Sequence, residues 1–412
     1  MRSLRLRGQS IDGAHQRIRP EKHRFAADVA PVSPDPINLD IPDEHLHEPP
    51  KRKRFMWWRN LNRNVRFGII ALLLLFFGAA AFLYYQHVNA SGDVAYGFIK
   101  HKQSKPKAPT TVASPLTGVQ VDPSLAARPV TGIMIENSDY ARPQSGLQDA
   151  GVVYEAIAEA GITRFLALFQ DAAPQYIGPV RSLRPYYIDF AAPFQASIVH
   201  VGGSPDALAE VTSGGFRNLD QFANSAYFSR ISSRDAPHNV YTNFNNLDKL
   251  NQAKGYTSSN FTSWPRKADK ALKVPTAKTI DLKISSPDFY SHYDYDAASN
   301  SYLRSEAGAP HLEITSPTDK GVQIKPKVVI ALVMPLSRGA LDSSGAYYSN
   351  YQTSGTGSAY IFQDGGVTAG QWSKSGTTDQ FKFTDSTGAP IKLNAGQTWI
   401  TLVSPGQVSY TP

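Results

Sequence analysis

The sequence predicts three parts: one N-terminal transmembrane helix, an N-terminal ectodomain of α/β or α+β class, and a mostly antiparallel β C-terminal domain. The helix is predicted by 19 uncharged residues between Phe67 and Tyr85. The mixed class is predicted because strand-like stretches alternate with short helix starts between residues 130 and 250. The β class is predicted because apolar stretches separated by Gly-bearing turns fill the chain after residue 277.

The uncharged segment from Phe67 to Tyr85 has about the length that a helix needs to cross roughly 30 Å of hydrocarbon. Two tryptophans precede it and two tyrosines close it, as interfacial anchors do. It begins too far from the N-terminus for an ordinary cleaved signal peptide. We therefore expect a single-pass signal anchor in the cell membrane, with the N-terminus cytoplasmic and the C-terminal domains extracytoplasmic. The positive-inside rule supports this orientation through the preceding basic residues Lys51, Arg52, Lys53, Arg54, Arg59, Arg63 and Arg66.

Composition divides the chain further. Residues 1–50 lack apolar periodicity and predict a disordered cytoplasmic tail. The remaining predicted parts are a basic juxtamembrane segment (51–66), the signal anchor (67–88), a polar extracytoplasmic stalk (89–113), an N-terminal α/β domain (114–250), a linker (251–276) and a β-rich C-terminal domain (277–412).

Charge and cysteine content exclude several classes of function. The net charge of +8 belongs mostly to residues 1–66, which carry 14 basic against 8 acidic residues, whereas the chain from Ala108 onward carries 24 against 25. A nucleic-acid partner is therefore not expected. The absence of cysteine excludes disulfides, thiolate nucleophiles and Cys-ligated metals. The four ectodomain histidines are scattered and no nucleotide-binding motif occurs, so we expect no metal site and no cofactor.

Local patterns predict several elements of the N-terminal domain. A strand is expected from Val130 to Glu136, and the stretch from 151 to 170 predicts two strands about a turn near Gly161, although its alanines also suit a helix. Another strand is expected in "ASIVHVGG". Ser204 then has the features of a helix cap, with Pro205 as the first helical residue.

Arg181 and Arg184 precede Pro185, which suits the first position of a helix. Cations at a helix start oppose the helix dipole, so an acidic neighbour or an anionic ligand is expected beside them. The possible neighbours are Glu155, Glu159 and Asp189. For the ligand alternative, we expect at least one guanidinium to be open to solvent, in a concave pocket that includes His200 or His238.

Three charged side chains fall in the predicted hairpin around Gly161. If the turn consists of Ala160 and Gly161, Glu155, Glu159 and Arg164 lie on one face, because side chains alternate along a strand. Two carboxylates on one face can form an acid/base pair, and carboxylates facing an arginine more often form a salt-bridge network.

Further candidate residues lie after this hairpin. Ser204 does not fit a nucleophile elbow and is better explained as a helix cap, and the backbone beside it is a second candidate anion site. His200, at a strand end, is well placed for proton transfer, but a lone histidine is more often structural. The polar turn "SSRDAPHNVYTNF" is a candidate binding loop through Arg234, His238 and Asn239.

Several ordered segments resemble the YerB-like family of bacterial exported proteins, a domain of unknown function followed by a distinct C-terminal domain. They are "RPVTGIMIENSDYARPQSGLQDAGVVYEAIAEAGITRFLALFQ", "IGPVRSLRPYYIDFA", "HVGGSP" and "RDAPHNVYT", and more weakly "SAYIFQDGGVTAGQW" and "IKLNAGQTWITLV". The resemblance is strong over 115–250 and weaker over 287–402. It implies a two-domain extracytoplasmic envelope protein and transfers no catalytic residues. Some members look like lipoproteins, whereas this chain has no cysteine to carry a lipid.

Three functions remain open. The first is binding of an anionic envelope ligand, such as a wall-polymer phosphate, a muropeptide carboxylate or an acidic protein, through an arginine-rich pocket. Its expected residues are Arg164, Arg181, Arg184 and the helix start at Ser204. The second is an envelope glycan or peptide hydrolase that uses Glu155 or Glu159 with His200 or His238. The third is a docking role for the β-rich domain in an envelope complex. No catalytic motif is recognised, so an enzyme is the less favoured class.

Overall fold

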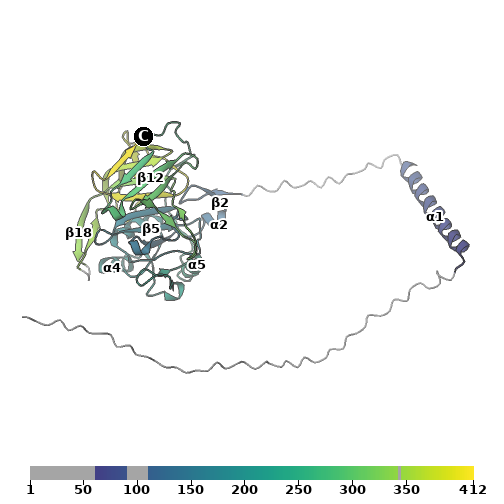
Figure 1. Cartoon of the computed structure of the whole chain (residues 1–412), viewed down its shortest axis with the longest axis horizontal. Helices are drawn as coiled ribbons and strands as arrows, with labels where there is room; N and C mark the ends of the chain where they lie inside the picture. The colour runs from purple at the N-terminus through teal and green to yellow at the C-terminus, as the bar shows by residue number, and fades with distance from the viewer. Residues whose placement is uncertain (1–60, 91–109, 342–344) are drawn as a thin grey trace, which may run out of the picture. The chain divides into compact units, whose positions relative to one another are not determined.

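The computed structural model describes residues 61–90, 110–341 and 345–412, so the predicted tail and most of the predicted stalk lie outside the described residues. The chain divides into two units, Met1–His101 and Lys102–Pro412. In the first unit, helix α1 (Arg63–Ala90) contains the predicted anchor segment (Figure 1). Within the described ranges α1 is the one helix long and apolar enough to cross a membrane.

The second unit is built around a ten-stranded mixed sheet (Figure 1). The strand order runs from an edge strand of the C-terminal half to an edge strand of the N-terminal half. In that order the strands are β22 (Lys382–Asp385), β21 (Gly366–Lys374), β20 (Gly355–Gln363), β17 (Val328–Val333), β24 (Thr398–Val403), β4 (Val152–Ile157), β5 (Thr163–Phe169), β3 (Thr131–Glu136), β6 (Ser197–His200) and β7 (Arg217–Asp220).

The two predicted ectodomain domains share this sheet. Strand β24 pairs in parallel with β4, with Thr398–Thr401 against Val152–Glu155. Strand β17 also pairs in parallel with β24, so the C-terminal half is strand-rich but not wholly antiparallel. The predicted linker 251–276 therefore does not separate two bodies, because strands from both sides of it are neighbours in one sheet.

A second sheet and several short strand pairs complete the β structure. The five-stranded antiparallel sheet has the order β14 (Ala309–Pro310), β13 (Ser301–Glu306), β12 (Ser291–Asp296), β11 (Thr279–Leu282) and β25 (Val408–Thr411). The two-stranded pairs are β1 (Val112–Ala113) with β2 (Gln120–Val121), β8 (Ser229–Arg230) with β9 (Val240–Tyr241), β10 (Arg266–Lys267) with β23 (Leu393–Asn394), β15 (Leu312–Glu313) with β16 (Val322–Gln323), and β18 (Leu336–Leu341) with β19 (Tyr347–Tyr351).

The helices of the second unit are short, and two of them begin where the sequence predicts. Pro185 is the first residue of α3, and Ser204 caps α4 by accepting a hydrogen bond from the backbone N–H of Ala207. The α-helices are α2 (Pro123–Ala126), α3 (Pro185–Ala191), α4 (Pro205–Ser213) and α5 (Phe244–Ala253). Single 3₁₀ turns are η2 (Asp139–Ala141), η3 (Ala192–Phe194), η4 (Ser225–Tyr227) and η5 (Pro287–Phe289).

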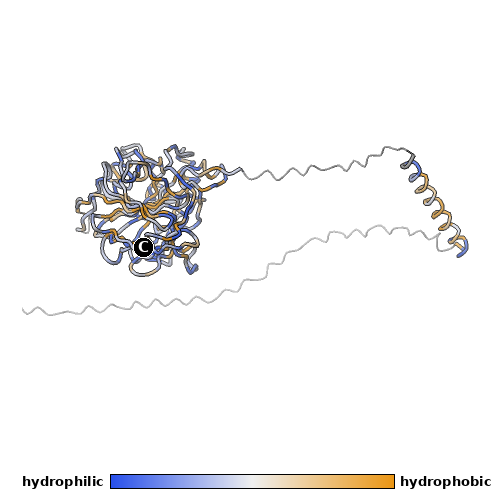
Figure 2. The backbone as a smooth tube through the Cα atoms, turned by 90° about the horizontal axis from the view of Figure 1, so that it is seen from above, coloured by the Kyte–Doolittle hydropathy of each residue, from blue (hydrophilic) through white to orange (hydrophobic). Residues whose placement is uncertain are grey.

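The large sheet is apolar on both faces, which explains why its central strands are almost entirely buried. Neighbouring residues along β3, such as Ile133 and Met134, belong to two different core clusters, as the alternation of side chains requires. One face packs against α3 and α4, and the other against α5 and the five-stranded sheet. Figure 2 shows the resulting apolar interior of the folded unit.

The hairpin of β4 and β5 confirms the two predicted strands and excludes the helix alternative, but its predicted register is wrong. Ile157 pairs with Thr163 and Ala156 with Arg164, and the N–H of Ala158 donates to the carbonyl of Ile162, so the loop contains three residues rather than two. Ala160 and Gly161 both have positive φ in this loop, at 52° and 80°. Since a shift of one residue moves a side chain to the opposite face, Arg164 does not share a face with Glu155.

Candidate functional site

The carboxylate of Glu159 lies between two of the predicted arginines. Nη2 of Arg164 donates to one carboxylate oxygen and Nη2 of Arg184 donates to the other, both at 2.7 Å. The arginine side chains are only 2% and 6% exposed. Nη1 of Arg164 donates to the carbonyl of Ser182, and Nη1 of Arg184 donates to the carbonyl of Leu183. Arg164 and Arg184 are therefore held by groups of this chain.

The charges of this cluster stabilise one another. Burial raises the pKa of Glu159, but Arg164 and Arg184 lower it by more, so that pKa lies below its usual value. The ring of Tyr348 covers the Arg184 guanidinium at 4.7 Å. For Arg184 the structure thus shows the alternative in which a glutamate of the preceding hairpin neutralises the arginine. An open Arg184 is excluded.

Glu155 belongs to a different buried cluster. Its carboxylate accepts two hydrogen bonds from Nη2 of Arg304, at 2.9 and 3.0 Å, and both side chains are 0% exposed. Nε1 of Trp399 and Oγ1 of Thr401 also donate to this carboxylate, at 3.1 and 3.2 Å. Glu155 is therefore a fully paired structural carboxylate, and Arg304 is a partner that the sequence analysis missed.

The polar groups around Arg304 continue through the interior. Nη1 of Arg304 lies 3.0 Å from Nδ1 of His311, and the carboxylate of Glu306 accepts a hydrogen bond from Nδ2 of Asn137 at 2.7 Å. Burial and the neighbouring guanidinium of Arg304 lower the pKa of His311 well below its usual value. Burial raises the pKa of Glu306. Both groups are thus biased toward their uncharged forms.

A third cluster brings Arg181 and His238 together around Glu136, at the end of β3. Nδ1 of His238 lies 2.9 Å from Oε1 of Glu136, and Nε of Arg181 lies 3.3 Å from the same oxygen. Ser138 donates to that oxygen as well, at 2.9 Å. Glu136 is 4% exposed, whereas the side chains of Arg181 and His238 are 23% and 20% exposed. Arg181 is thus the more open of the two predicted arginines, and it lies close to His238.

His238 also lines a cavity of about 540 Å³. The exposed ring of Tyr140 lies beside the imidazole, with 5.4 Å between the ring centroids. Arg234 lines the same cavity and donates to the carbonyls of Tyr140 and Pro143 at 2.7 and 2.5 Å. Nε2 of His238 has no hydrogen-bond partner within the described ranges. The other lining residues include Arg142, Tyr176, Ser232, Ser233, Asp235 and Asp319.

The remaining predicted residues lie outside this cavity. His200 is fully buried, and its ring nitrogens lie 2.8 Å from the carbonyl oxygen of Gly202 and 3.0 Å from Oδ1 of Asn218. Ser204 serves as the cap of α4. Asn239 accepts a hydrogen bond from Arg230. In the part of the chain that the structure describes, no three His, Asp or Glu side chains are arranged to hold a metal ion.

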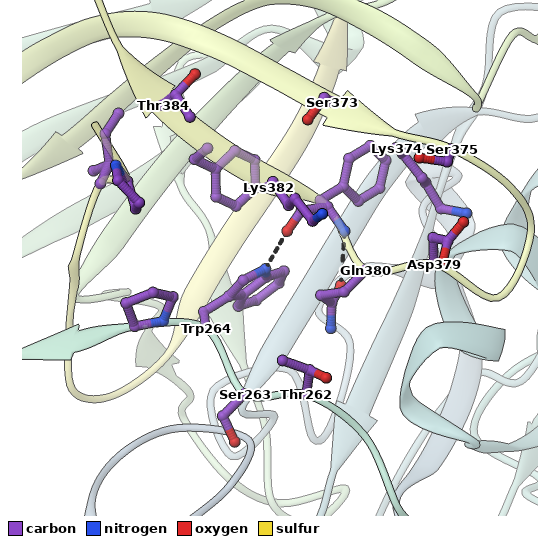
Figure 3. A pocket seen from close by; sticks show the side chains of 15 residues that line it. Thr262, Ser263, Trp264, Ser373, Lys374, Ser375, Asp379, Gln380, Lys382 and Thr384 are labelled. Atoms are coloured by element: carbon purple, nitrogen blue, oxygen red, sulfur yellow. Dashed lines mark hydrogen bonds between the residues drawn. The ribbon is translucent and has the colours of Figure 1, made fainter. Parts of the chain in front are cut away.

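A second cavity, of about 530 Å³, lies beside Trp264 in the stretch expected to be a linker (Figure 3). Nε1 of Trp264 donates to the carbonyl of Phe381 at 2.8 Å, and Oε1 of Gln380 accepts from the N–H of the same residue at 3.1 Å. Lys374 also lines the cavity, and burial lowers its pKa. The aromatic side chains that line it, Trp264, Phe381 and Phe383, are buried in the core and leave little free ring surface for a ligand. This cavity is therefore the weaker candidate for a binding site.

Known protein families match this chain over both halves of its second unit. Residues 116–257 match the family described as "Protein of unknown function (DUF3048) N-terminal domain", and residues 280–400 match the corresponding "C-terminal domain". A relative from Bacillus subtilis (strain 168), named "Putative lipoprotein YerB", is 29% identical over 311 residues, which cover 74% of this chain and 90% of the relative.

The fold is shared as well. The crystal structure of the YerB protein from Bacillus subtilis superimposes with a TM-score of 0.63 at 26% sequence identity, over 73% of this chain and 100% of that chain. The matched segments are the two whose strands meet through β4 and β24 in the large sheet. With both segments matched and the fold in common, the chain belongs to the YerB-like family of envelope-associated bacterial proteins, whose two domains have no assigned function.

Proposed function

We propose that the chain is a single-pass membrane protein whose ectodomain binds an anionic, sugar-containing ligand of the cell envelope in the cavity beside His238. The name of the relative indicates attachment by a lipid. This chain has no cysteine for a lipid, and α1 supplies an apolar helix of membrane-spanning length instead. The basic residues before α1 favour a cytoplasmic N-terminus and an extracytoplasmic second unit.

The observation that carries the proposal is the unpartnered Nε2 of His238 at a polar cavity that also has aromatic walls. Glu136 fixes the imidazole through Nδ1, so the ring presents its other nitrogen to a ligand. Tyr140 packs beside His238 and Tyr176 stacks on Tyr241, and the opposite face of each ring can pack against the apolar face of a sugar. Arg181, which is partly exposed beside Glu136, adds a positive charge near the cavity.

The binding test uses the full chain in detergent and soluble fragments released from purified cell walls, with affinity measured by calorimetry. We expect His238→Ala to weaken binding by about tenfold, equivalent to roughly 1.4 kcal/mol. His292→Ala is the matched control, because His292 is another partly exposed histidine with carboxylate neighbours, Asp281 and Asp294. Affinity should also fall as salt rises from about 0.05 to about 0.5 M, because the screening length shortens about threefold over this range. Equal affinities of the wild type and His238→Ala would exclude this cavity as the site.

The hydrolase hypothesis requires Glu155 or Glu159 to lie within reach of His200 or His238, and the side chains of these residues have other partners. Glu155 is paired with Arg304, Glu159 is shared by two arginines, and His200 is bonded to groups of its own neighbourhood. His238 contacts Glu136 and neither of the glutamates that the hypothesis names. The geometry therefore favours ligand binding over hydrolysis by these residues.

A further inference from the structure

Three polar side chains from distant parts of the sequence meet beside the short parallel pair of β10 and β23. Lys267 is directly opposite Asn394 in this pair, and Asp364 lies in the turn between β20 and β21. Nζ of Lys267 is hydrogen bonded to Oδ1 of Asn394 and to Oδ2 of Asp364. Nδ2 of Asn394 donates to Oδ1 of Asp364 at 2.7 Å. One carboxylate thus contacts both the lysine amine and the nitrogen of the asparagine amide.

The surrounding residues hold these groups in place. Asn394 is fully buried, the side chain of Asp364 is 10% exposed and that of Lys267 is 29% exposed. Oδ1 of Asp364 accepts further hydrogen bonds from Nδ2 of Asn300 at 2.9 Å and from the backbone N–H of Lys270 at 3.1 Å. These contacts fix the carboxylate without using the oxygen that contacts the lysine. The site is therefore organised before any reaction occurs.

We propose that Lys267 and Asn394 become joined by an intramolecular isopeptide bond, with Asp364 as the acid–base group. Asp364 takes a proton from the Lys267 ammonium, and the free amine attacks Cγ of Asn394. Asp364 returns that proton to Nδ2 of Asn394, the Cγ–Nδ2 bond breaks and ammonia leaves. The remaining extra proton on Nζ passes through Asp364 to the ammonia, so the products are a secondary amide and an ammonium ion. The carboxylate is regenerated, and no oxidant or cofactor is consumed.

The carboxylate of Asp364 is ionised before the first step. Burial raises the pKa of Asp364, but hydrogen bonds from Lys267, Asn300 and Asn394 lower it by more, to about 2. Asp364 is therefore a carboxylate before the reaction, and its Oδ2 lies directly against the ammonium. Because so low a pKa makes the carboxylate a weak base, removal of the ammonium proton is the energetically uphill step, and the direct contact is what allows the transfer. The partial exposure of Lys267 gives the released ammonia a route to solvent.

The bond would link two distant segments of the second unit covalently. It would join positions 127 residues apart and lock two strands that contain only two residues each. A cross-link that closes a long loop restricts the unfolded chain. It would also do so without a disulfide, in a chain that has no cysteine.

Mass spectrometry of the full chain purified in detergent tests the proposal. We expect an intact mass about 17 Da below the mass of the sequence, which is the loss of one ammonia. A tryptic digest should contain a branched peptide that joins the Lys267 and Asn394 segments. A folded wild-type protein with the full sequence mass and no branched peptide would overturn the proposal.

Two variants separate this bond from other losses of ammonia. Lys267→Arg and Asp364→Asn should both keep the full mass expected for their sequences. Lys270→Arg is the matched control, because only the backbone of Lys270 contacts Asp364, and it should lose ammonia like the wild type. Loss of ammonia that persists in Lys267→Arg would show a reaction of asparagine alone, such as ring closure with its own backbone, and would overturn the proposal.

Discussion

Replacing Arg304 with methionine would leave the carboxylate of Glu155 inside the protein without its cation. Both side chains are 0% exposed, so solvent cannot replace the lost partner. Removing one member of a buried ion pair costs about 3–5 kcal/mol. The folded unit has about 300 residues, and at roughly 2.1 cal/mol/K per residue its entropy of unfolding is about 0.6 kcal/mol/K. A loss of about 4 kcal/mol should therefore lower Tm by about 6 °C.

Scanning calorimetry of the full chain measures this effect. The double variant Glu155→Gln with Arg304→Met should recover much of the stability, since no charge remains buried. Arg338→Met, at an exposed position, is the control. A single variant with wild-type Tm, or a double variant no more stable than the single one, would refute the reasoning.

Two further stability changes follow from single contacts. Burial raises the pKa of Glu313 to about 7, above about 4.3 in the unfolded chain, so the folded state should lose stability as pH rises between these values. Glu313→Gln should remove that slope and gain ~1–3 kcal/mol at about pH 8 in urea unfolding, and an unchanged slope would contradict this assignment. A Cβ on Gly370 would lie 2.1 Å from the carbonyl oxygen of Thr384, so Gly370→Ala should separate β22 from β21 and cost about 1–3 kcal/mol. Gly376→Ala, whose nearest neighbour is 3.5 Å away, should unfold at the wild-type temperature, and equal Tm values for both variants would argue against the clash.

Features set by neighbouring residues could be predicted from the sequence. Pro185 and Ser204 mark helix starts because capping and the fixed φ of proline act within one turn. The strands of the 151–170 hairpin follow from their apolar residues. The loop length did not follow, because Ala160 and Gly161 indicate where the turn lies but not whether Glu159 joins it. That one residue decided which face Arg164 occupies.

The partners of the predicted charges could not be predicted, since they come from remote parts of the chain. Arg304 pairs with Glu155 across 149 positions, and no local pattern links them. The sequence shows only that Arg304 lies two residues after Tyr302 in the part of the chain expected to be β-rich. Likewise, Glu136 ends an apolar strand, where a carboxylate tends to meet groups from the next loops. Trp264 lay in a stretch without periodicity, which gave no reason to expect a cavity wall.

The pairing of β4 with β24 has a consequence for how the protein is made. Glu155 and Thr401, on these two strands, are 246 positions apart, so β4 leaves the ribosome long before its neighbour. Until the final segment arrives, one edge of an apolar central strand stays open, and open edges of this kind promote aggregation. A protein cut between the two family segments would carry this exposed edge permanently. The two segments should therefore fold only together, and neither is a module that can be transplanted alone.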